Sequence, residues 1–523
     1  MIQNRNFQRF LLSLLILVGP GLSSQAQAPN LPYDSLNIPT VPKTIYVDDT
    51  ASGSDTGTSW ANAYTNLQTA LGAANPSDEI WVASGTYKPG AARGHTFQLK
   101  NGVALYGGFP DGGGDGTFIA RKPKLYHTLL SGEIGNPSIK TDNTYHVVTG
   151  SGNNTTAIID GFTITRGYTP VSADTGMGGG FYIYNGSPTV SGISFMDNFA
   201  ENYGGGMANV YLGNPLVVNC TFTGNMTNGS GGGLVNLYGA STTIVNSTFA
   251  GNAAGGASAI ANYSGGGAYV RNIIAWGNNI ANPAIGVDSG SSISVQYSLI
   301  QGMSVYPGTG NINPDPLYLD GDGWDNMYGT LDDDLRLQET SPAVDAGDNT
   351  AVPSDIPDLD NDGNTSEKIP FDQYGKTRFI DIFQVTDTGN GSAPLVDMGA
   401  IETPIWRDIN VSPVSLDVAI KIGDSTTRAL ILQNLGSYAD LNWTLSENPE
   451  ASWLTENKTS GALQRGCANQ IDVTFDSAIL NTGVYTSALE ISSDDPDEAL
   501  IKIPVSFTVQ IRTIFLPLVS FGS

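Results

Sequence analysis

The stretch GGGMANVYLGNPLVVNCTFTGNMTNGS, residues 204–230, is followed directly by GGGLVNLYGASTTIVNSTFAGNAAGGA, residues 231–257, and the two align without a gap. A related segment, GGGFYIYNGSPTVSGISFMDNFAENY, precedes them at residues 178–203, and a degenerate fourth copy ends in RNIIAWGNN. Such internal repetition is typical of stacked structural units, none of which can bury its apolar face alone. The repeat therefore decides the fold.

Two residue types recur every 27 positions: the aromatic residues Phe195, Phe222, Phe249 and Trp276, and the polar residues Asn198, Asn225, Asn252 and Asn279. Between them lie short runs that alternate apolar with polar residues or are β-branched, and these runs predict short strands. Coils stacked at about 4.8 Å would bury the aromatic column and join the asparagine amides from coil to coil. We therefore expect an all-β protein, a right-handed parallel β-helix of 27-residue coils. The glycine triplets precede strands and not helices, so they do not predict a phosphate-binding loop.

The segments that flank the repeat are TIYVDDTASGSDTGTSWANAYTNLQTAL and DEIWVASGTYKP on one side and DGDGWDNMYGTLDDDLRLQETSPAVDAGDN, PDLDNDGN and VDMGAIE on the other. Over residues 43–402 the chain resembles pectate-lyase-like, right-handed parallel β-helix proteins exported by bacteria. The resemblance implies a first strand and a short amphipathic helix that cap the apolar end of the β-helix. Leu67, Ala70 and Leu71 have the spacing of such a helix. The resemblance implies the fold and export, and it implies no particular activity.

The first residues have the three parts of a secretory signal: Arg5 and Arg9, a short apolar run, and Ala-Gln-Ala at 26–28. We expect cleavage after residue 28, with an uncleaved anchor as the alternative. The β-helix, with its N-terminal cap and acidic C-terminal loops, is then predicted over residues 29–403. No later segment is long and apolar enough to predict a transmembrane helix.

Beyond residue 403 the triplets stop, and about seven short strands separated by turn residues predict an immunoglobulin-like β-sandwich over 404–511. Trp443, Trp453 and Leu454 are predicted to lie in its core. The apolar tail, 512–523, is either a sorting or attachment segment or the last strand of the sandwich. The two cysteines, Cys220 and Cys467, fall in different domains, and two buried thiols are expected in preference to a disulfide.

The charge composition restricts the classes of binding partner that can be expected. Asp and Glu outnumber Lys and Arg by 49 to 23, and the net charge is −26. Binding to a nucleic-acid backbone depends on clustered Lys and Arg, so no nucleic-acid partner is expected. The acidic surface favours solubility and divalent cations.

Residues 315–362 hold fourteen carboxylates and one basic residue, Arg336. Asp358-Leu-Asp360-Asn-Asp362-Gly363 matches the first half of an EF-hand calcium loop, but the twelfth position is Ile369 and not Glu. Calcium is the expected cofactor, and a solvated acidic loop is the alternative. The predicted ligands are Asp320, Asp322, Asp325, Asp358, Asp360 and Asp362.

No catalytic residue is assigned. The Gly-His-Gly and Arg-x-Lys elements of hydrolases with this fold do not occur in the sequence. Arg166 and Arg271 lie in the coils, where a lyase base would point outward to a groove, and an ordinary surface role is their alternative. Six tyrosines near the glycine triplets suit either stacking on polysaccharide or packing between coils: Tyr182, Tyr184, Tyr211, Tyr238, Tyr263 and Tyr269.

The sequence thus favours a secreted, non-catalytic extracellular or cell-surface protein that acts in adhesion or in binding an extracellular polysaccharide or cell-wall glycan. The alternative is a calcium-dependent polysaccharide lyase or a glycoside hydrolase. A third hypothesis is a purely structural component of a surface layer.

Overall fold

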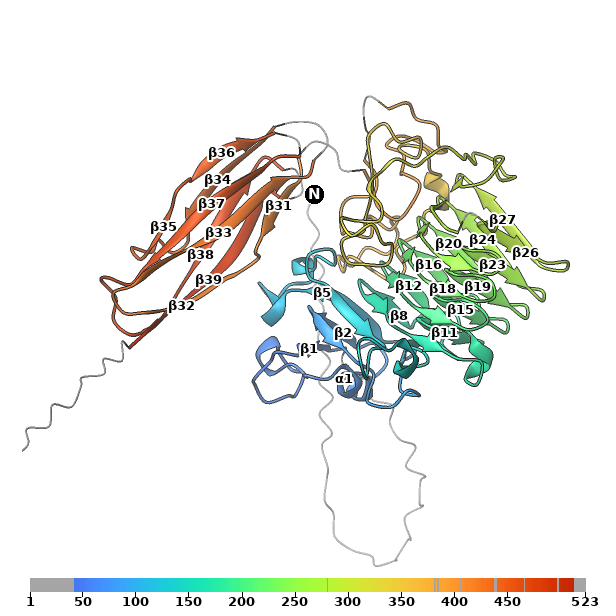
Figure 1. Cartoon of the computed structure of the whole chain (residues 1–523), viewed down its shortest axis with the longest axis horizontal. Coiled ribbons are helices and arrows are strands. Elements are labelled where there is room, and N and C mark those ends of the chain that lie inside the picture. The colour runs from blue at the N-terminus through green and yellow to red at the C-terminus, as the bar shows by residue number, and fades with distance from the viewer. Residues whose placement is uncertain are drawn as a thin grey trace, which may run out of the picture. The chain divides into compact units, whose positions relative to one another are not determined.

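The computed structural model describes residues 42–279, 281–380, 382, 385–403, 407–436, 440–464, 466–495 and 498–511. The predicted signal segment, 1–28, and tail, 512–523, lie outside these residues. The described chain is almost entirely β, and it forms a parallel β-helix followed by an antiparallel β-sandwich (Figure 1).

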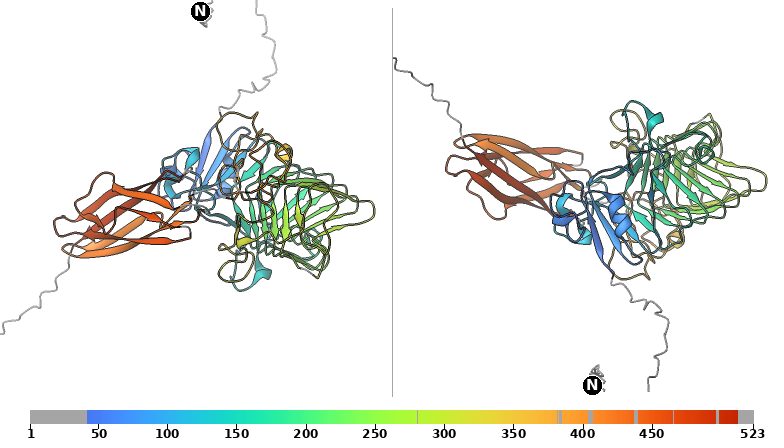
Figure 2. Two further views of the ribbon diagram at one scale, coloured as in Figure 1. Left: turned by 90° about the horizontal axis from the view of Figure 1, so that it is seen from above. Right: turned by 90° about the horizontal axis from the view of Figure 1, so that it is seen from below.

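Each coil of the β-helix contributes in turn to the same sheets, so strands of one sheet come from successive coils. Figure 2 shows the coils stacked in sequence order. The nine-stranded sheet contains β1 (Thr44–Val47), β2 (Glu79–Ala83), β5 (Ala104–Phe109), β8 (Ile158–Asp160), β12 (Thr189–Ser191), β16 (Leu216–Val218), β20 (Ser241–Val245), β24 (Gly267–Arg271) and β27 (Ser292–Gln296). The eight-stranded sheet contains β3 (Gly85–Tyr87), β6 (Thr128–Ser131), β9 (Thr163–Thr165), β13 (Ser194–Met196), β17 (Thr221–Thr223), β21 (Thr248–Ala250), β25 (Ile274–Trp276) and β28 (Leu299–Ile300).

Two further sheets complete the wall of the β-helix. The seven-stranded sheet contains β4 (Phe97–Gln98), β7 (Val148–Thr149), β11 (Phe181–Tyr184), β15 (Met207–Val210), β19 (Leu234–Leu237), β23 (Ile260–Tyr263) and β26 (Ile285–Val287). The four-stranded sheet contains β10 (Tyr168–Thr169), β14 (Phe199–Ala200), β18 (Met226–Thr227) and β22 (Ala253–Ala254). Short 3-10 turns interrupt the chain: η1 (Trp60–Asn62), η2 (Asp111–Gly113), η3 (Phe118–Ala120), η4 (Lys140–Asp142), η5 (Asp174–Gly176) and η6 (Asn349–Ala351).

The helix α1 (Leu67–Ala73) confirms the predicted amphipathic helix. Asn66 caps it, because its side chain accepts hydrogen bonds from the amides of Gln68 and Thr69. Leu67, Ala70 and Leu71 are buried in the same apolar cluster as the first strands of the β-helix.

Inside the coils the predicted columns form. The ring centroids of Phe195 and Phe222 lie 4.4 Å apart and those of Phe222 and Phe249 lie 4.5 Å apart, with nearly parallel planes. The buried Asn225 amide donates to Oδ1 of Asn252 at 3.0 Å and to the Phe195 carbonyl at 2.8 Å, and its own Oδ1 accepts from Asn198. Each amide of the asparagine ladder therefore provides hydrogen bonds to both a backbone group and a side-chain group of neighbouring coils.

The structure corrects the last member of both columns. Phe249 pairs with Ala275 and not with Trp276, and Asn252 bonds to Asn278 and not to Asn279. This coil is one residue shorter than the one before it. Ala254 lies 27 positions after its partner Thr227, but Ile260 lies only 26 positions after its partner Leu234, so the missing residue falls between Ala254 and Ile260. A one-residue shift places a side chain on the opposite face of its strand. Trp276 is accordingly half-buried in a different cluster, outside the main core.

Residues 315–403, here called the return segment, run back over the outside of the coils. Their regular elements are few, the hairpin strands β29 (Tyr318–Asp320) and β30 (Asp334–Leu337). Asn219 donates to the Phe371 carbonyl at 2.8 Å, and the Ala400 amide donates to Thr248 at 3.0 Å. The acidic loops that the sequence placed at the end of the β-helix therefore lie along its side.

The sandwich consists of two sheets. One contains β31 (Ile409–Ser412), β33 (Ser425–Asn434), β37 (Ala468–Asp476) and β35 (Leu454–Glu456), and the other contains β32 (Leu416–Lys421), β39 (Leu500–Gln510), β38 (Gly483–Ser493), β34 (Leu441–Glu447) and β36 (Ser460–Leu463). Trp443, Trp453 and Leu454 are buried in its core, as predicted. Both cysteines are free: Cys220 is buried, but Cys467 is exposed, so the prediction of two buried thiols is wrong for Cys467. Cys467 directly precedes β37, outside the strands that form the sandwich core.

The ladder gives a first testable prediction. Replacing Asn225 by Ala removes, within the core, the amide that donates to the Phe195 carbonyl and the oxygen that accepts from Asn198, and we expect the free energy of unfolding to fall by about 3 kcal/mol. Asn228→Ala, at an exposed position of the same coil, should change it by less than about 0.5 kcal/mol. Urea unfolding measures both, and equal effects would contradict a structural ladder.

Candidate functional site

The return segment is fixed to the coils by a buried ion pair. Arg378, which is fully buried, donates to Glu402 at 3.1 Å and to the Asn219 side chain at 3.0 Å. It also donates to the carbonyls of Gly399 and Ala400. A buried guanidinium whose charge is paired and whose two terminal nitrogens each donate two hydrogen bonds holds one geometry, although its Nε has no partner. The cavities between the return segment and the coils thus have fixed walls.

A groove crosses five successive strands of the nine-stranded sheet on its outer face. The volume of the groove is about 650 Å³. Its floor is a row of residues that pair with one another from strand to strand: Glu79, Ala104, Ile158, Thr189 and Leu216. The return segment forms one wall with Pro353, Ser354, Ile356 and Pro357. Since strands of one sheet are about 4.8 Å apart, the groove floor is about 19 Å long. Among the described residues that line the groove, none is Lys or Arg.

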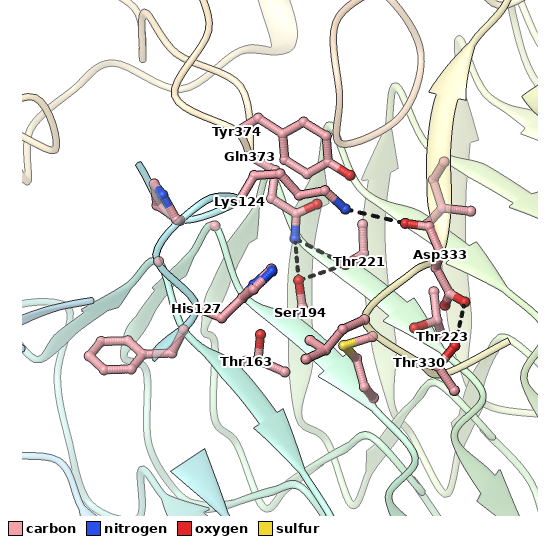
Figure 3. Close-up of a pocket in the computed structure, with 17 residues that line it drawn as sticks. Lys124, His127, Thr163, Ser194, Thr221, Thr223, Thr330, Asp333, Gln373 and Tyr374 are labelled. Carbon is pink, nitrogen blue, oxygen red and sulfur yellow. Dashed lines mark hydrogen bonds between the residues drawn. The ribbon is translucent and has the colours of Figure 1, made fainter. Parts of the chain in front are cut away.

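A second, polar cavity of about 50 Å³ lies on the eight-stranded sheet (Figure 3). Gln373 of the return segment donates to the hydroxyls of Ser194 and Thr221, each at 3.0 Å. Lys124, next to Gln373 in Figure 3, donates to the Asp333 carbonyl at 3.4 Å. The volume holds a few water molecules and is too small for a sugar ring.

Two of the titratable groups that line this cavity, Asp333 and His127, have pKa values shifted to between about 4 and 6. Burial raises the pKa of Asp333 to about 6, against the hydrogen bond that its carboxylate accepts from the Gly329 amide. Burial, with the neighbouring charge of Lys124, lowers the pKa of His127 to about 4. Asp333 is the one carboxylate among the lining residues. Because glycoside hydrolysis ordinarily uses two carboxyl groups, this cavity alone does not provide that chemistry.

A third cavity, of about 150 Å³, adjoins the polar one and is lined by Arg121, Asp160 and Asp360. Arg121 forms an ion pair with Asp160 and donates to the Gly107 carbonyl at 2.8 Å. The rings of Tyr106, Phe109 and Phe118 surround the guanidinium. Arg121 is thus held in a structural role. Sequence reasoning missed Arg121 because it precedes the repeat and belongs to no recurring motif.

The structure brings together one half of the predicted metal ligands. Carboxylate oxygens of Asp358, Asp360 and Asp362 lie within 4.8 Å of one another, and Asp360 belongs to a second such group with Asp355 and Glu367. Burial raises the pKa of Asp355 to about 6, and the charges of Asp360 and Asp358 contribute to the increase.

Glu367 was not among the predicted ligands, although it lies two residues before Ile369, the twelfth position of the loop. Ile369 is buried in the apolar cluster beneath the loop, which leaves Glu367 to supply a carboxylate. Its Oε1 is buried without a hydrogen-bond partner. Asp320, Asp322 and Asp325 form no comparable group in the part of the chain that the structure describes.

Neither coil arginine points a free guanidinium into a groove. Arg271 is 5% exposed, donates to the carbonyls of Val270 and Ser294, and lies 3.8 Å from the Tyr269 ring centroid. Arg271 lies on the outer side of its strand, next to the core residue Val270, but its guanidinium folds over the Tyr269 ring and is not free to face a groove. Arg166 is partly exposed and lies 3.4 Å from Asp197.

The tyrosines divide into two groups. Tyr184, Tyr211 and Tyr238 are exposed and follow one another at 4.9 Å between ring centroids, whereas Tyr182 and Tyr263 pack onto an outer apolar cluster. Because the rings of Tyr211 and Tyr238 stack on each other, they cover each other's faces. A flat platform for sugar rings is therefore not formed by this column.

Comparison with known proteins leaves the function open. No protein family matches the sequence, and no curated protein matches it either. The chain is similar in structure to a PapD-like domain of human CEP192, with 15% identity over 23% of this chain and 100% of that one, at a TM-score of 0.17. It is similar to a Bacteroides ovatus GH5 xyloglucanase, with 14% identity over 21% and 20% of the two chains, at a TM-score of 0.16. Similarities at this level carry no functional argument.

Asp333 gives a pH-dependent prediction. Since its pKa is raised from an ordinary value near 3.8 to about 6, the folded chain binds this proton more tightly than the unfolded chain does. The contribution to stability is complete below about pH 4 and is lost as the pH rises through about 6. Between about pH 4 and pH 6 we expect the free energy of unfolding of the wild type to fall, relative to that of Asp333→Asn, by up to about 3 kcal/mol.

Urea unfolding over a series of pH values measures this difference. Asp332→Asn is the control, because a hydrogen bond from Thr330 lowers the pKa of Asp332 and its contribution is lost in the opposite direction, as the pH falls. A constant difference between wild type and Asp333→Asn across this range would contradict the assignment.

Proposed function

We propose that this protein is an exported, non-catalytic β-helix protein that binds an extended extracellular polysaccharide in the groove on its nine-stranded sheet. The observation that carries the proposal is the shape of the groove, which crosses five coils in strict register. An extended glycan repeats at a spacing close to that of the coils, so successive sugars meet equivalent positions. The resemblance to pectate-lyase-like proteins supports export.

The chemistry of the groove favours a neutral glycan. Ala104, Ile158 and Leu216 offer apolar contacts to the faces of sugar rings, and Thr155, Thr156 and Thr189 offer hydroxyls. The charged lining residues, Asp78 and Glu79, are acidic and would repel uronates. Glu79 accepts a hydrogen bond from the Trp81 indole at 2.8 Å, so its carboxylate is already oriented by the protein.

The groove is tested by a substitution at its rim. Ile356 is 77% exposed, so Ile356→Asp should leave the fold unchanged while it adds a charge that the ligand would have to desolvate. We expect affinity for a neutral polysaccharide to fall about tenfold or more. Affinity electrophoresis in gels that contain neutral polysaccharides or polygalacturonate measures retention.

Ile479→Asp, in the sandwich and 73% exposed, is the matched control. Unaltered retention of Ile356→Asp would reject the groove as the binding site. New reducing ends or unsaturated products in the same samples would instead establish the alternative, a lyase or hydrolase.

We also propose that calcium binds the loop of Asp355, Asp358, Asp360, Asp362 and Glu367. Burial and the neighbouring carboxylate charges raise the pKa values of Asp360 and Glu367, and Glu367 has a buried oxygen without a partner; both observations support a hard cation at this position. Bound calcium would hold the return segment, and with it the wall of the groove, against the coils.

Calcium should therefore stabilise the chain, by about 2.7 kcal/mol when free calcium is about 100 times its dissociation constant. Asp360→Asn should abolish this gain, because Asp360 belongs to both carboxylate groups. Asp417→Asn, an exposed position in β32, is the control. Thermal unfolding with calcium and with chelator decides the point, and an equal gain in Asp360→Asn would place calcium elsewhere.

A further inference from the structure

The tip of the hairpin in the return segment exposes large apolar side chains. Trp324 is 82% exposed, Met327 is 63% exposed and Leu331 is 45% exposed. Every other described tryptophan is buried or half-buried. A local concentration of exposed apolar surface of this kind marks an interaction site.

The tip is a compact, ordered turn. The Met327 amide donates to the Asp322 carbonyl at 2.9 Å, and the Asp325 amide donates to the Asp332 carboxylate at 3.3 Å. The Thr330 hydroxyl donates to the Met327 carbonyl at 3.2 Å. These three bonds close the loop, and Trp324 remains exposed within it.

Tyr328 holds this turn on the coils. It lies against a column of glycines, Gly224, Gly251 and Gly277, each with a left-handed φ between 61° and 66°. A Cβ atom at Gly251 would lie 2.1 Å from Tyr328 Cγ, and one at Gly277 would lie 2.9 Å from its hydroxyl. The column has no side chains because Tyr328 occupies their space. Trp324 is thus presented from a rigid support, which lowers the entropy lost on binding.

Carboxylates surround the exposed indole in the sequence of the turn: Asp320, Asp322, Asp325 and Asp332. All four are exposed or half-exposed, and no ion pair between described residues includes any of them. A tryptophan face attracts a cation through the ring quadrupole, and nearby carboxylates add direct attraction. Met327 and Leu331 provide apolar surface for the aliphatic stem of a Lys or Arg side chain.

We propose that this turn, residues 320–332, is a docking surface for a cationic segment, rich in Arg and Lys, of another protein. Charge complementarity selects this occupant, because anionic and neutral partners would leave four carboxylates without compensation. The net charge of −26 would attract such a segment over longer distances, and the turn would hold it in place. The surface is separate from the glycan groove and does not depend on it.

The test measures binding of a fluorescent oligo-arginine peptide to the purified chain by anisotropy, in chelator and at about 0.15 M salt, where only nearby charges act strongly. We expect Trp324→Ala to weaken binding about tenfold or more, and Trp324→Phe to weaken it less because an aromatic face remains. The double variant Asp322→Asn/Asp325→Asn should weaken binding and reduce its dependence on salt. An oligo-glutamate peptide should not bind.

Asp417→Asn and Ile479→Ala are the matched controls, one exposed carboxylate and one exposed apolar side chain from the sandwich. Wild-type affinity in Trp324→Ala, or equal weakening in Asp417→Asn and the double variant, would overturn the proposal in favour of diffuse charge attraction. Loss of glycan retention in Trp324→Ala with peptide binding unchanged would overturn it in favour of a sugar-binding surface. Equal thermal unfolding temperatures of all variants establish that each is folded.

Discussion

The coil-to-coil register is the constraint on which the rest of the structure depends. In a parallel β-helix every side chain faces either the core or the outside, and a slip of one residue exchanges the two. The buried asparagine ladder resists such a slip, because each amide bonds to the next ladder member and to a carbonyl of the preceding coil. Register is therefore maintained by hydrogen bonds between buried side chains at matching positions of successive coils.

The outer surface follows from the same register. The floor of the groove is a single row of paired positions, and the glycines beneath Tyr328 are another. The return segment is irregular in itself, yet its shape is determined because it packs against rows that repeat. Arg378 completes this arrangement, because it bonds both to Glu402 of the return segment and to Asn219, in the turn between β16 and β17. An irregular segment thus acquires fixed geometry from a regular support.

The sequence was sufficient for the coils and for the sandwich core, because periodic burial leaves a periodic pattern. Phe195, Phe222, Phe249 and the cap helix were found in this way. The pattern failed at Trp276, where one residue is missing from a turn and the similarity of the residue types concealed the shift. A second buried ladder, Asn209, Asn236 and Asn262, was present at nearly the same interval and was overlooked.

The site was predicted less completely, for a physical reason. Asp358, Asp360 and Asp362 are neighbours in sequence, and local spacing sufficed to group them. Glu367 and Asp355 join them only through the fold of the return segment, and Arg121 meets Asp160 only through the stacking of coils. Residues of an irregular segment that contact a repeat have no fixed separation in the sequence, so no sequence pattern predicts these contacts.

The anchors of the return segment also fix the number of coils. Arrays of repeats ordinarily gain and lose whole units with little effect on the units that remain. Here Asn219, Thr248 and the glycines at 224, 251 and 277 must each meet one particular residue of a segment whose length is constant. An inserted coil between them would separate every anchor from its partner. The fixed length of the return segment therefore fixes the number of coils between its anchors. The number of coils can vary only outside the part that the segment spans.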